Sequence, residues 1–354
     1  MIVEAMVKDI QQAQEFCHIE FYIWQPGGMT EHVAQALEDA SKRGVHCRVM
    51  LDAVGSAEFF RSGAARRLRR ANIELVKACP IGIMPWRLAR YDLRNHRKTV
   101  VIDGKVSYIG SFNLVDPALF KVGAGVGQWI DIMARIEGPA AIMIDAVFRW
   151  YWQIETGSTL KISLPKPNPI LTHSVIQVAP TGPDAAEHSM LNLLLQAIYV
   201  AADSVDIVTP YFVPGEALAT ALKIAAQRGV KVRIILPAKV DSFLVRYASR
   251  SYFVDLLDAG AEIFQYPQGL LHSKCIVIDS GLAFFGTVNL DTRSLWLNFE
   301  LTTIFYDIAT AQQLQAIVDS YRQQATPIHL HEWHQRKIPT RFFENTIRLF
   351  SPLI

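Results

Sequence analysis

The alternation of apolar and polar positions predicts the same order of elements twice along the chain. In the first half, Ile19–Gly27 reads as a strand, Glu31–Ser41 as an amphipathic helix and Arg43–Leu51 as a helix end followed by a buried strand. Short apolar runs indicate strands, and apolar positions repeating every three to four residues indicate helices. The second half repeats this order at Val205–Gly215, Glu216–Gln227 and Arg228–Leu236.

Strands that alternate with helices favour parallel sheets covered by helices on both faces, which is an α/β/α sandwich. We therefore expect two similar α/β halves, residues 1–164 and 165–354. The boundary falls in Leu164–Ile170, where three prolines favour a linker over a helix or central strand. A loop within one domain is the alternative.

A longer pattern of polar residues is also duplicated. The first copy has His, Lys, Asp, Gly, a hydroxyl residue and Asn at fixed spacing, and the second copy keeps every spacing. The matching positions are His96, Lys98, Asp103, Gly110, Ser111 and Asn113, and His272, Lys274, Asp279, Gly286, Thr287 and Asn289. Such a match indicates a shared chemical site, so we expect the two halves to pack together with the active site at their interface.

The period of a strand separates the roles within this pattern. Asn95–Ile102 reads as a strand in which His96 and Lys98 point to one face, and Asp103-Gly104 is a two-residue hairpin signal before a strand over Val106–Gly110. Asp103 then falls at the turn, on the opposite face. Although Asp103 and Asp279 belong to the catalytic motif, we interpret both as structural.

A histidine that acts as a nucleophile needs a carboxylate to fix its tautomer. Asp131 and Glu300 are the candidates, since each stands alone on an apolar strand. Each follows the histidine of its own half, which predicts the pairs His96 with Asp131 and His272 with Glu300. The alternative is a carboxylate that caps a helix or pairs with a surface arginine.

The motif suits phosphoryl chemistry without a metal or cofactor. Two lysines, with Ser111, Thr287, Asn113 and Asn289, can neutralise and bind one phosphoryl anion. Two histidines can divide the roles of nucleophile and general acid. The sequence has no zinc-like cysteine cluster, His-Glu-x-x-His motif or glycine-rich phosphate loop.

Composition narrows the classes of partner. The chain has 354 residues, 51% of them hydrophobic, which is enough for one large core or two ordinary ones. A net charge of +2 lacks the dense basic stripe of a nucleic-acid binder. Four cysteines without paired spacing favour a reducing compartment, and the chain shows neither a signal peptide nor an apolar run long enough to span a membrane.

The duplicated motif resembles the HxKx4Dx6G(S/T)xN signature of the phospholipase D superfamily. Further stretches resemble bacterial cardiolipin synthases of the two-motif type, and they cover nearly the whole chain: Phe21–Gly28, Val126–Asp131, Thr209–Pro214 and Gly286–Glu300. Such synthases usually carry membrane-spanning segments before the catalytic region. Here the chain begins almost at the first strand, so we expect a naturally short form or a catalytic fragment, soluble or only peripherally bound to the membrane.

The resemblance implies phosphatidyl transfer between two phosphatidylglycerol molecules, which gives cardiolipin and glycerol through a phosphohistidine. By analogy His96 is the nucleophile and His272 the general acid and base, although the near-symmetry allows the reverse. It also implies the cytoplasmic face of the bacterial membrane, an anionic membrane surface as partner, no nucleic acid and no obligatory protein partner. The rivals are a phospholipase D that hydrolyses phospholipids, a nuclease of the same superfamily, and an inactive scaffold or lipid-binding module.

Two segments are candidates for lipid contact. Ile81–Arg94 mixes aromatic and apolar residues with arginines, as suits the headgroup region of anionic lipid. Arg341–Ile354 is an amphipathic tail. The alternatives are a partly buried loop with paired arginines for the first segment and docking on the protein's own core for the second.

Overall fold

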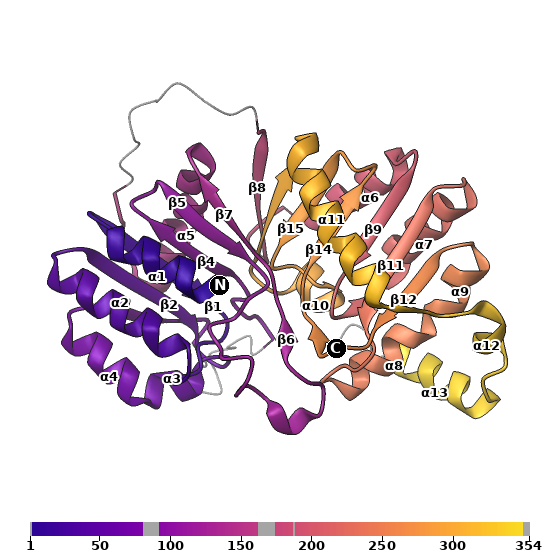
Figure 1. Ribbon diagram of the computed structural model, residues 1–354, viewed down its shortest axis with the longest axis horizontal. Coiled ribbons are helices and arrows are strands. Elements are labelled where there is room, and N and C mark those ends of the chain that lie inside the picture. Colours follow the sequence, from indigo (N-terminus) through magenta and orange to yellow (C-terminus); the bar gives the residue numbers. More distant parts are fainter. Residues whose placement is uncertain (1, 81–91, 162–173, 187, 350–354) are drawn as a thin grey trace. The chain divides into compact units, whose positions relative to one another are not determined.

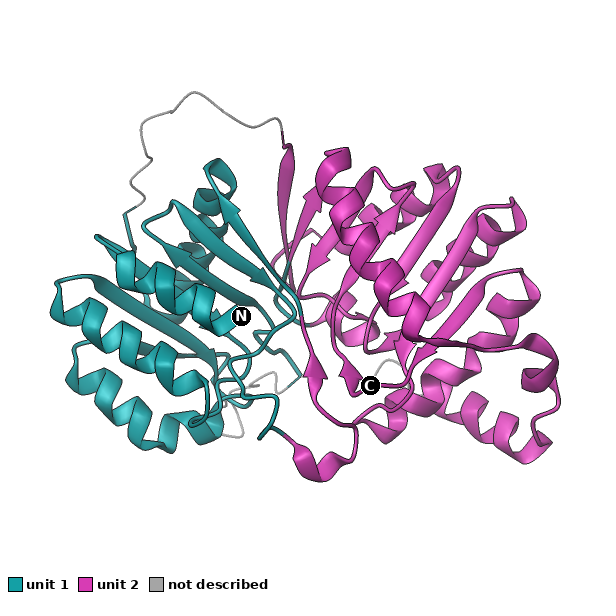
Figure 2. Ribbon diagram, viewed as in Figure 1, with its two compact units in different colours: residues 1–120, 132–171, 298–301 teal, residues 121–131, 172–297, 302–354 magenta. Residues whose placement is uncertain are grey.

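The computed structural model of the chain (Figure 1) describes residues 2–80, 92–161, 174–186 and 188–349. The chain divides into two compact units (Figure 2). Unit 1 comprises residues 1–120, 132–171 and 298–301, and unit 2 comprises residues 121–131, 172–297 and 302–354. Compared with a division at 164/165, the described segments 121–131 and 298–301 change sides. The expected linker Leu164–Ile170 lies outside the described residues.

Unit 1 is built on a six-stranded sheet in the order β3-β2-β1-β4-β5-β7. The strands are β1 (Phe16–Phe21), β2 (His46–Asp52), β3 (Glu74–Ala78), β4 (Lys98–Ile102), β5 (Val106–Gly110) and β7 (Met133–Glu137). The helices are α1 (Ile2–Gln12), α2 (Thr30–Lys42), α3 (Ala57–Arg61), α4 (Gly63–Arg70) and α5 (Pro139–Thr156).

Helices cover both faces of this sheet, as the sequence predicts. Val49 and Leu51 of β2 belong to the core cluster beneath α1, α2 and α4. Met50, between them, packs with Phe148 and Trp152 of α5. The alternation follows from the period of two along a strand that is buried on both faces.

The sheet is mixed, which corrects the expectation of parallel sheets. Only β1, β2 and β3 run parallel, whereas β4, β5 and β7 pair antiparallel with their neighbours. The reason is the hairpin inside the first motif, between β4 and β5, because so short a turn cannot make the crossover that parallel strands need. This turn spans the three residues between Ile102 and Val106 rather than two, and both Asp103 and Gly104 have positive φ.

Unit 2 repeats the plan on a larger sheet, in the order β18-β12-β11-β9-β14-β15-β17-β8. Its strands are β8 (Ile176–Thr181), β9 (Ser204–Val208), β11 (Lys231–Pro237), β12 (Glu262–Tyr266), β14 (Cys275–Ile278), β15 (Leu282–Gly286), β17 (Glu300–Phe305) and β18 (Thr326–Pro327). Again β9, β11 and β12 are parallel, and β14 and β15 form an antiparallel hairpin. The second motif therefore occupies the same topological position as the first.

Helices and two small parallel ladders complete unit 2. The helices are α6 (Ser189–Val200), α7 (Gly215–Gln227), α8 (Phe243–Ser251), α9 (Phe253–Asp258), α10 (Thr292–Trp296), α11 (Ile308–Gln324), α12 (Leu330–His334) and α13 (Ile338–Arg348). The ladders join β10 (Phe212–Val213) to β16 (Leu290–Asp291) and β6 (Trp129–Ile130) to β13 (Leu270–Leu271). Among the described residues, no helix has the length and apolar character that a membrane crossing requires.

Candidate active site

Each motif histidine is held by a backbone contact to a short segment from the other half of the sequence. His96 lies two residues before β4 and donates its backbone N–H to the carbonyl of Phe299, at 2.9 Å. His272 lies between β13 and β14 and donates its N–H to the carbonyl of Ile130, also at 2.9 Å. The predicted strand over Asn95–Ile102 thus begins only at Lys98, because its first residues pair with residue 299 instead.

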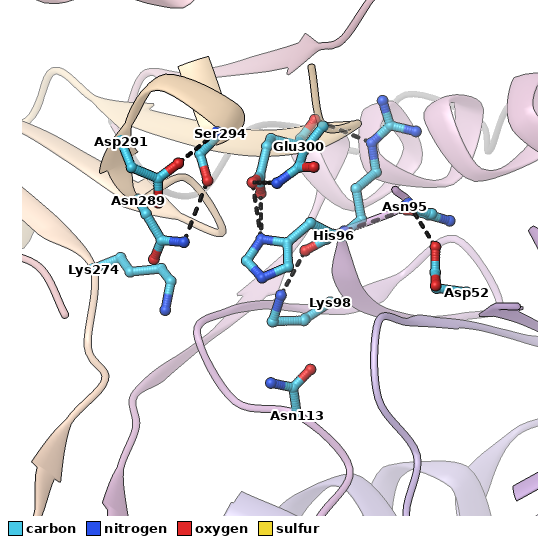
Figure 3. A network of polar contacts seen from close by, with 12 residues as sticks. Asp52, Asn95, His96, Lys98, Asn113, Lys274, Asn289, Asp291, Ser294 and Glu300 are labelled. Atoms are coloured by element: carbon cyan, nitrogen blue, oxygen red, sulfur yellow. Dashed lines mark hydrogen bonds and ion pairs between the residues drawn. The ribbon is translucent and has the colours of Figure 1, made fainter. Parts of the chain in front are cut away.

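The residue after each carbonyl acceptor is the acid that orients the histidine. The Nδ1 atom of His96 lies 2.8 Å and 3.0 Å from the two carboxylate oxygens of Glu300 (Figure 3). The Nδ1 atom of His272 lies 2.6 Å from Oδ1 of Asp131. Both acids are buried within their pairs, with side chains 0% and 3% exposed.

The predicted pairing of these acids is therefore wrong. Each acid does lie beside a motif histidine, but not beside the one that the sequence predicts. Glu300 serves His96 and Asp131 serves His272, so each histidine takes its acid from the other half of the sequence. The reason is the packing of two short segments, 121–131 and 298–301, which we call the exchanged segments. Residues 298–301 belong to unit 1, and residues 121–131 belong to unit 2, where β6 pairs with β13.

Both motif lysines are buried and hydrogen-bonded to the carbonyl of their own histidine. Lys98 Nζ lies 2.6 Å from the His96 carbonyl oxygen, and Lys274 Nζ lies 2.8 Å from that of His272. Lys274 also lies 3.0 Å from Nε2 of His272, so the two side chains share a face as the strand period predicts. An ammonium group has only donors, so Nε2 accepts this bond and the proton of the neutral ring is on Nδ1, facing Asp131.

The hydroxyl and amide residues of the motif are buried and partly engaged by the backbone. Ser111 accepts from the N–H of Ile132 at 3.1 Å, and Asn113 Oδ1 accepts from the N–H of Ile23 at 3.2 Å. Asn289 donates to the Ser294 hydroxyl at 3.2 Å (Figure 3). Thr287 is fully buried on the β15 side of the second motif. These contacts fix the positions of the side chains that we expect to bind substrate.

The two motif aspartates lie in the hairpin turns, as the parity argument predicts. Asp103 accepts hydrogen bonds from the backbone N–H groups of residues 14, 15 and 16, at 2.8–2.9 Å. Asp279 does the same for residues 202, 203 and 204. Burial alone would raise the pKa of Asp279, but these three donors outweigh it and lower the pKa below its ordinary value. Both carboxylates tie the start of a neighbouring strand to the turn.

A buried polar network supports the backbone around His96. The N–H of Asn95 donates to Asp52 at 3.0 Å (Figure 3). The side chain of Asn95 donates to Glu20 at 2.8 Å. Arg97 donates to the carbonyl of Glu300 at 3.0 Å and stacks on Tyr151, 3.5 Å from the ring centre. Burial raises the pKa of Glu20, against the opposing effect of Arg97. The residues on either side of His96 are thereby fixed.

Two aromatic residues beside the histidines were not identified from the sequence. Tyr22 meets His96 edge to face, with ring centres 5.0 Å apart, and Trp129 lies 4.4 Å from His272. The period of two would have found Trp129, because it shares a strand face with Asp131 two positions later. For Tyr22 the available signal is the internal repeat, which aligns its segment with the one that contains Tyr211.

Part of the expected lipid-contact segment Ile81–Arg94 can be placed. Residues 81–91 lie outside the described residues. Arg94 is buried, and it contacts Asp52 at 3.3 Å and the Cys79 carbonyl at 3.0 Å. Arg94 is therefore buried and paired, as expected if the segment is a partly buried loop with paired arginines and not a lipid contact. The described residues contain no cluster of histidine, cysteine and acidic side chains that could hold a metal ion.

Comparison with known protein families gives a match over most of the chain. Residues 6–151 and 194–322 match the family model described as "Cardiolipin synthase, PLD-like domain". The chain is 45% identical to proteins named Cardiolipin synthase A from Yersinia pestis and Klebsiella pneumoniae. The match covers 99% and 100% of this chain, and 73% and 74% of the two relatives.

Two solved structures share the fold at low sequence identity. A phosphatidylserine synthase from Haemophilus influenzae aligns with a TM-score of 0.70 at 14% identity, over 100% of this chain and 93% of that one. A polyphosphate kinase from Porphyromonas gingivalis aligns with a TM-score of 0.56 at 15% identity, over 90% of this chain and 47% of that one. At these identities the likeness concerns the fold alone, and it agrees with the two-unit α/β architecture.

Proposed function

Since the chain belongs to the cardiolipin synthase family of phospholipase D-like proteins, we propose that His96 and His272 together transfer a phosphatidyl group through a phosphohistidine. The enzyme is a phosphatidyltransferase that makes cardiolipin from phospholipid. The proposal concerns the route of the reaction, the role of each residue and phosphatidylglycerol as both donor and acceptor.

In the first step, Nε2 of His96 attacks the phosphorus of one phosphatidylglycerol. The bond from phosphorus to the headgroup glycerol breaks, and His272 in its doubly protonated form donates its Nε2 proton to the leaving oxygen. Free glycerol departs, and the phosphatidyl group remains on His96. The Glu300 carboxylate stabilises the positive charge that develops on the His96 ring.

In the second step, His272 removes a proton from the headgroup hydroxyl of a second phosphatidylglycerol. The oxygen attacks phosphorus, the bond between nitrogen and phosphorus breaks, and cardiolipin forms. His96 and His272 return to their starting protonation states, so the cycle is balanced. Lys98, Lys274, Ser111, Thr287, Asn113 and Asn289 bind the phosphoryl oxygens and neutralise their charge without a cofactor.

The observation that carries this proposal is the pair of buried contacts between Nδ1 and a carboxylate. With Nδ1 bonded to Glu300 or Asp131, Nε2 is the nitrogen left to react in each ring. One ring can then attack while the other transfers a proton. By analogy with the family, His272 is the ring that serves as acid and base. Its neutral form accepts from Lys274 at Nε2, the nitrogen that carries the transferred proton in the charged form.

Product analysis with phosphatidylglycerol in detergent micelles tests the reaction. We expect cardiolipin and free glycerol in equal amounts, measured by mass spectrometry. Phosphatidic acid as the main product would support hydrolysis instead. If neither cardiolipin nor phosphatidic acid forms, the proposed function is contradicted.

Trapping of the phosphatidyl-enzyme tests the role of His96. We expect rapid alkaline quenching to leave substrate phosphorus on the wild-type His96 peptide, and we expect His96→Asn to leave none. His46→Asn is the matched control, since His46 is an exposed histidine of β2 in the same unit. Label retained by His96→Asn would instead assign the nucleophile to His272.

We also propose that the enzyme works at the cytoplasmic face of the bacterial membrane, on an anionic surface. Its four cysteines are free thiols, which suits a reducing compartment. Protease digestion of intact spheroplasts and of lysed cells distinguishes the two faces. Digestion in intact spheroplasts would contradict the cytoplasmic assignment.

A further inference from the structure

Large apolar side chains are exposed together on helices α8 and α13 of unit 2, which lie side by side (Figure 1). Ile338 and Phe342 of α13 are 79% and 74% exposed, and Phe243 of α8 is 61% exposed. Leu244 and Phe343 are also exposed. We refer to these five residues, with Arg246, Lys337 and Arg341, as the α8–α13 surface.

The packing of α13 explains why its apolar side chains point outward. Glu344 and Ile347 are buried on the side that faces the rest of unit 2. Glu344 holds the helix there through ion pairs with Arg336 at 2.7 Å and Arg250 at 3.2 Å. Ile338 and Phe342, four positions apart, lie one above the other away from that side. Helix α13 therefore docks on the protein and still presents an apolar stripe. Residues 350–354 of the expected tail lie outside the described residues.

The exposed side chains form a continuous patch across the two helices. Phe343 lies 6.3 Å from Phe243 and 5.2 Å from Tyr247, measured between ring centres. Each large apolar side chain gains stability when it is buried, and a patch of several exposed ones on a monomer marks an interaction site. The question is which partner covers it.

The charge around the patch is strongly positive. Residues 243–251 and 336–349 contain six basic side chains, and their single acid is the buried Glu344. Arg246, Lys337 and Arg341 have no carboxylate within ion-pair distance among the described residues. A second copy of the chain would bring the same positive charges against each other. An anionic surface complements them.

A cavity of about 270 Å³ opens beside the apolar stripe. Arg336, Arg341 and Arg348 line it, together with two acids, Glu344 and Asp255. Arg336 pairs with Glu344 at 2.7 Å, and Arg348 pairs with Glu216 at 2.9 Å. A guanidinium group binds phosphate oxygens through two parallel N–H donors, so Arg341 at this cavity, with Arg246 on α8, supplies the donors for a phospholipid headgroup. Apolar side chains that enter the acyl region beside arginines at the headgroups are the arrangement of an interfacial helix.

We propose that the α8–α13 surface docks this enzyme on a bilayer that contains anionic phospholipid. Ile338, Phe342 and Phe243 enter the bilayer, and Arg246 and Arg341 hold lipid phosphates. The inference rests on the proposed function, in that the substrate lies in the membrane. It adds the part of the protein that brings the enzyme there.

Sedimentation with vesicles tests the docking. We expect the full chain to bind vesicles of phosphatidylglycerol mixed with phosphatidylcholine, and Ile338→Ser/Phe342→Ser to bind them at least about tenfold more weakly. Arg246→Gln/Arg341→Gln should lose roughly tenfold in affinity for the mixed vesicles while keeping the weak binding to phosphatidylcholine alone. Val200→Ser/Ile308→Ser is the matched control, because these apolar residues are 77% and 62% exposed outside the patch.

Activity separates the docking from the chemistry. With phosphatidylglycerol in detergent micelles, we expect wild type and all variants to make cardiolipin at equal rates, whereas Ile338→Ser/Phe342→Ser should be slow on vesicles. A wild type that makes no cardiolipin in micelles would contradict the proposed function and leave the binding measurement intact. Unchanged vesicle binding by the variants would overturn the docking proposal. The docking proposal would also be overturned if the wild type formed a dimer and did not bind vesicles, and if the variants lost the dimer.

Discussion

At the scale of single residues, the two carboxylates determine which nitrogen of each imidazole reacts. Glu300 and Asp131 each bond Nδ1, which leaves Nε2 for attack or proton transfer. Glu300 is itself fixed, since Asn298 donates to its carboxylate at 3.4 Å and Arg97 donates to its carbonyl. The acid therefore orients the ring and also stabilises its charged form.

We expect Glu300→Gln to lower kcat by about 10³–10⁴, because an amide can neither stabilise the charged His96 ring nor enforce its tautomer. The substitution preserves size, so the fold should survive. Cardiolipin formation in micelles measures the effect. Asp131→Asn is the matched variant for His272.

The exchanged pairing has its own test. In proton NMR, the Nδ1–H signal of each histidine that is bonded to a carboxylate should appear far downfield, and His96→Asn and His272→Asn assign the two signals. We expect Glu300→Gln to remove the His96 signal and leave that of His272. Loss of the His272 signal in Glu300→Gln would support the pairing within each half.

Asp279 stabilises the fold rather than the reaction. We expect Asp279→Asn to lower the free energy of unfolding by about 1 kcal/mol at neutral pH, because it weakens three hydrogen bonds to a charged group. Cardiolipin formation per folded molecule should stay within about twofold of wild type, since the carboxylate belongs to the turn. Urea unfolding followed by circular dichroism gives the stability.

The effect of Asp279 should depend on pH in a defined direction. Its pKa in the folded protein lies below the ordinary value of 3.8. Such a group contributes stability that is fully present above the unfolded-state pKa and is lost as pH falls through the folded-state pKa. The difference between wild type and Asp279→Asn should therefore shrink below about pH 4. A difference that grows as the pH falls would contradict this role.

At the scale of elements, the pairing of β6 with β13 determines where Asp131 lies. Leu270 donates its N–H to the Gln128 carbonyl at 2.9 Å, and Lys121 anchors the start of the segment through Asp241, also at 2.9 Å. Gly269 permits this close approach. It has φ +68°, and a Cβ atom there would lie 2.3 Å from the Gln128 carbonyl oxygen.

We expect Gly269→Ala to push β13 away from β6 and to lower kcat by about tenfold to a hundredfold, because a small displacement of Asp131 misorients His272. The rate of cardiolipin formation measures the loss. Gly260→Ala is the matched control, since Gly260 also has positive φ, in the same unit, but nothing lies within 4 Å of its Cβ position. Equal losses in the two variants would show that backbone strain alone is responsible.

Local features of the chain were sufficient to predict several elements and roles. The amphipathic stretches at Glu31–Ser41 and Glu216–Gln227 are α2 and α7, and the strand period separated the turn aspartates from the site. The exchange of Asp131 and Glu300 had no local signal. Each acid stands closer in sequence to the wrong histidine, and only the packing of residues 121–131 and 298–301 reverses the pairing.

At the scale of the whole molecule, each half of the sequence contributes a short segment to the unit that is built mainly from the other half. Each unit has its own hydrophobic core. Yet unit 1 includes residues 298–301, with Phe299 packed edge to face on Tyr151, and unit 2 includes residues 121–131. Neither half of the sequence contains both a motif histidine and the acid that orients it.

This exchange predicts how the enzyme responds to a cut between its halves. A protease site inserted between residues 164 and 165 should allow cleavage into two fragments that elute together in size-exclusion chromatography. Each fragment supplies a paired segment to the other's unit, through β6 with β13 and through the His96 backbone bond to Phe299. Denaturation in urea should separate them. Kcat after cleavage should stay within about twofold, because both contacts between a histidine and its acid persist. Fragments that separate without denaturant and retain activity individually would show that each half holds a complete site, which would contradict the exchange.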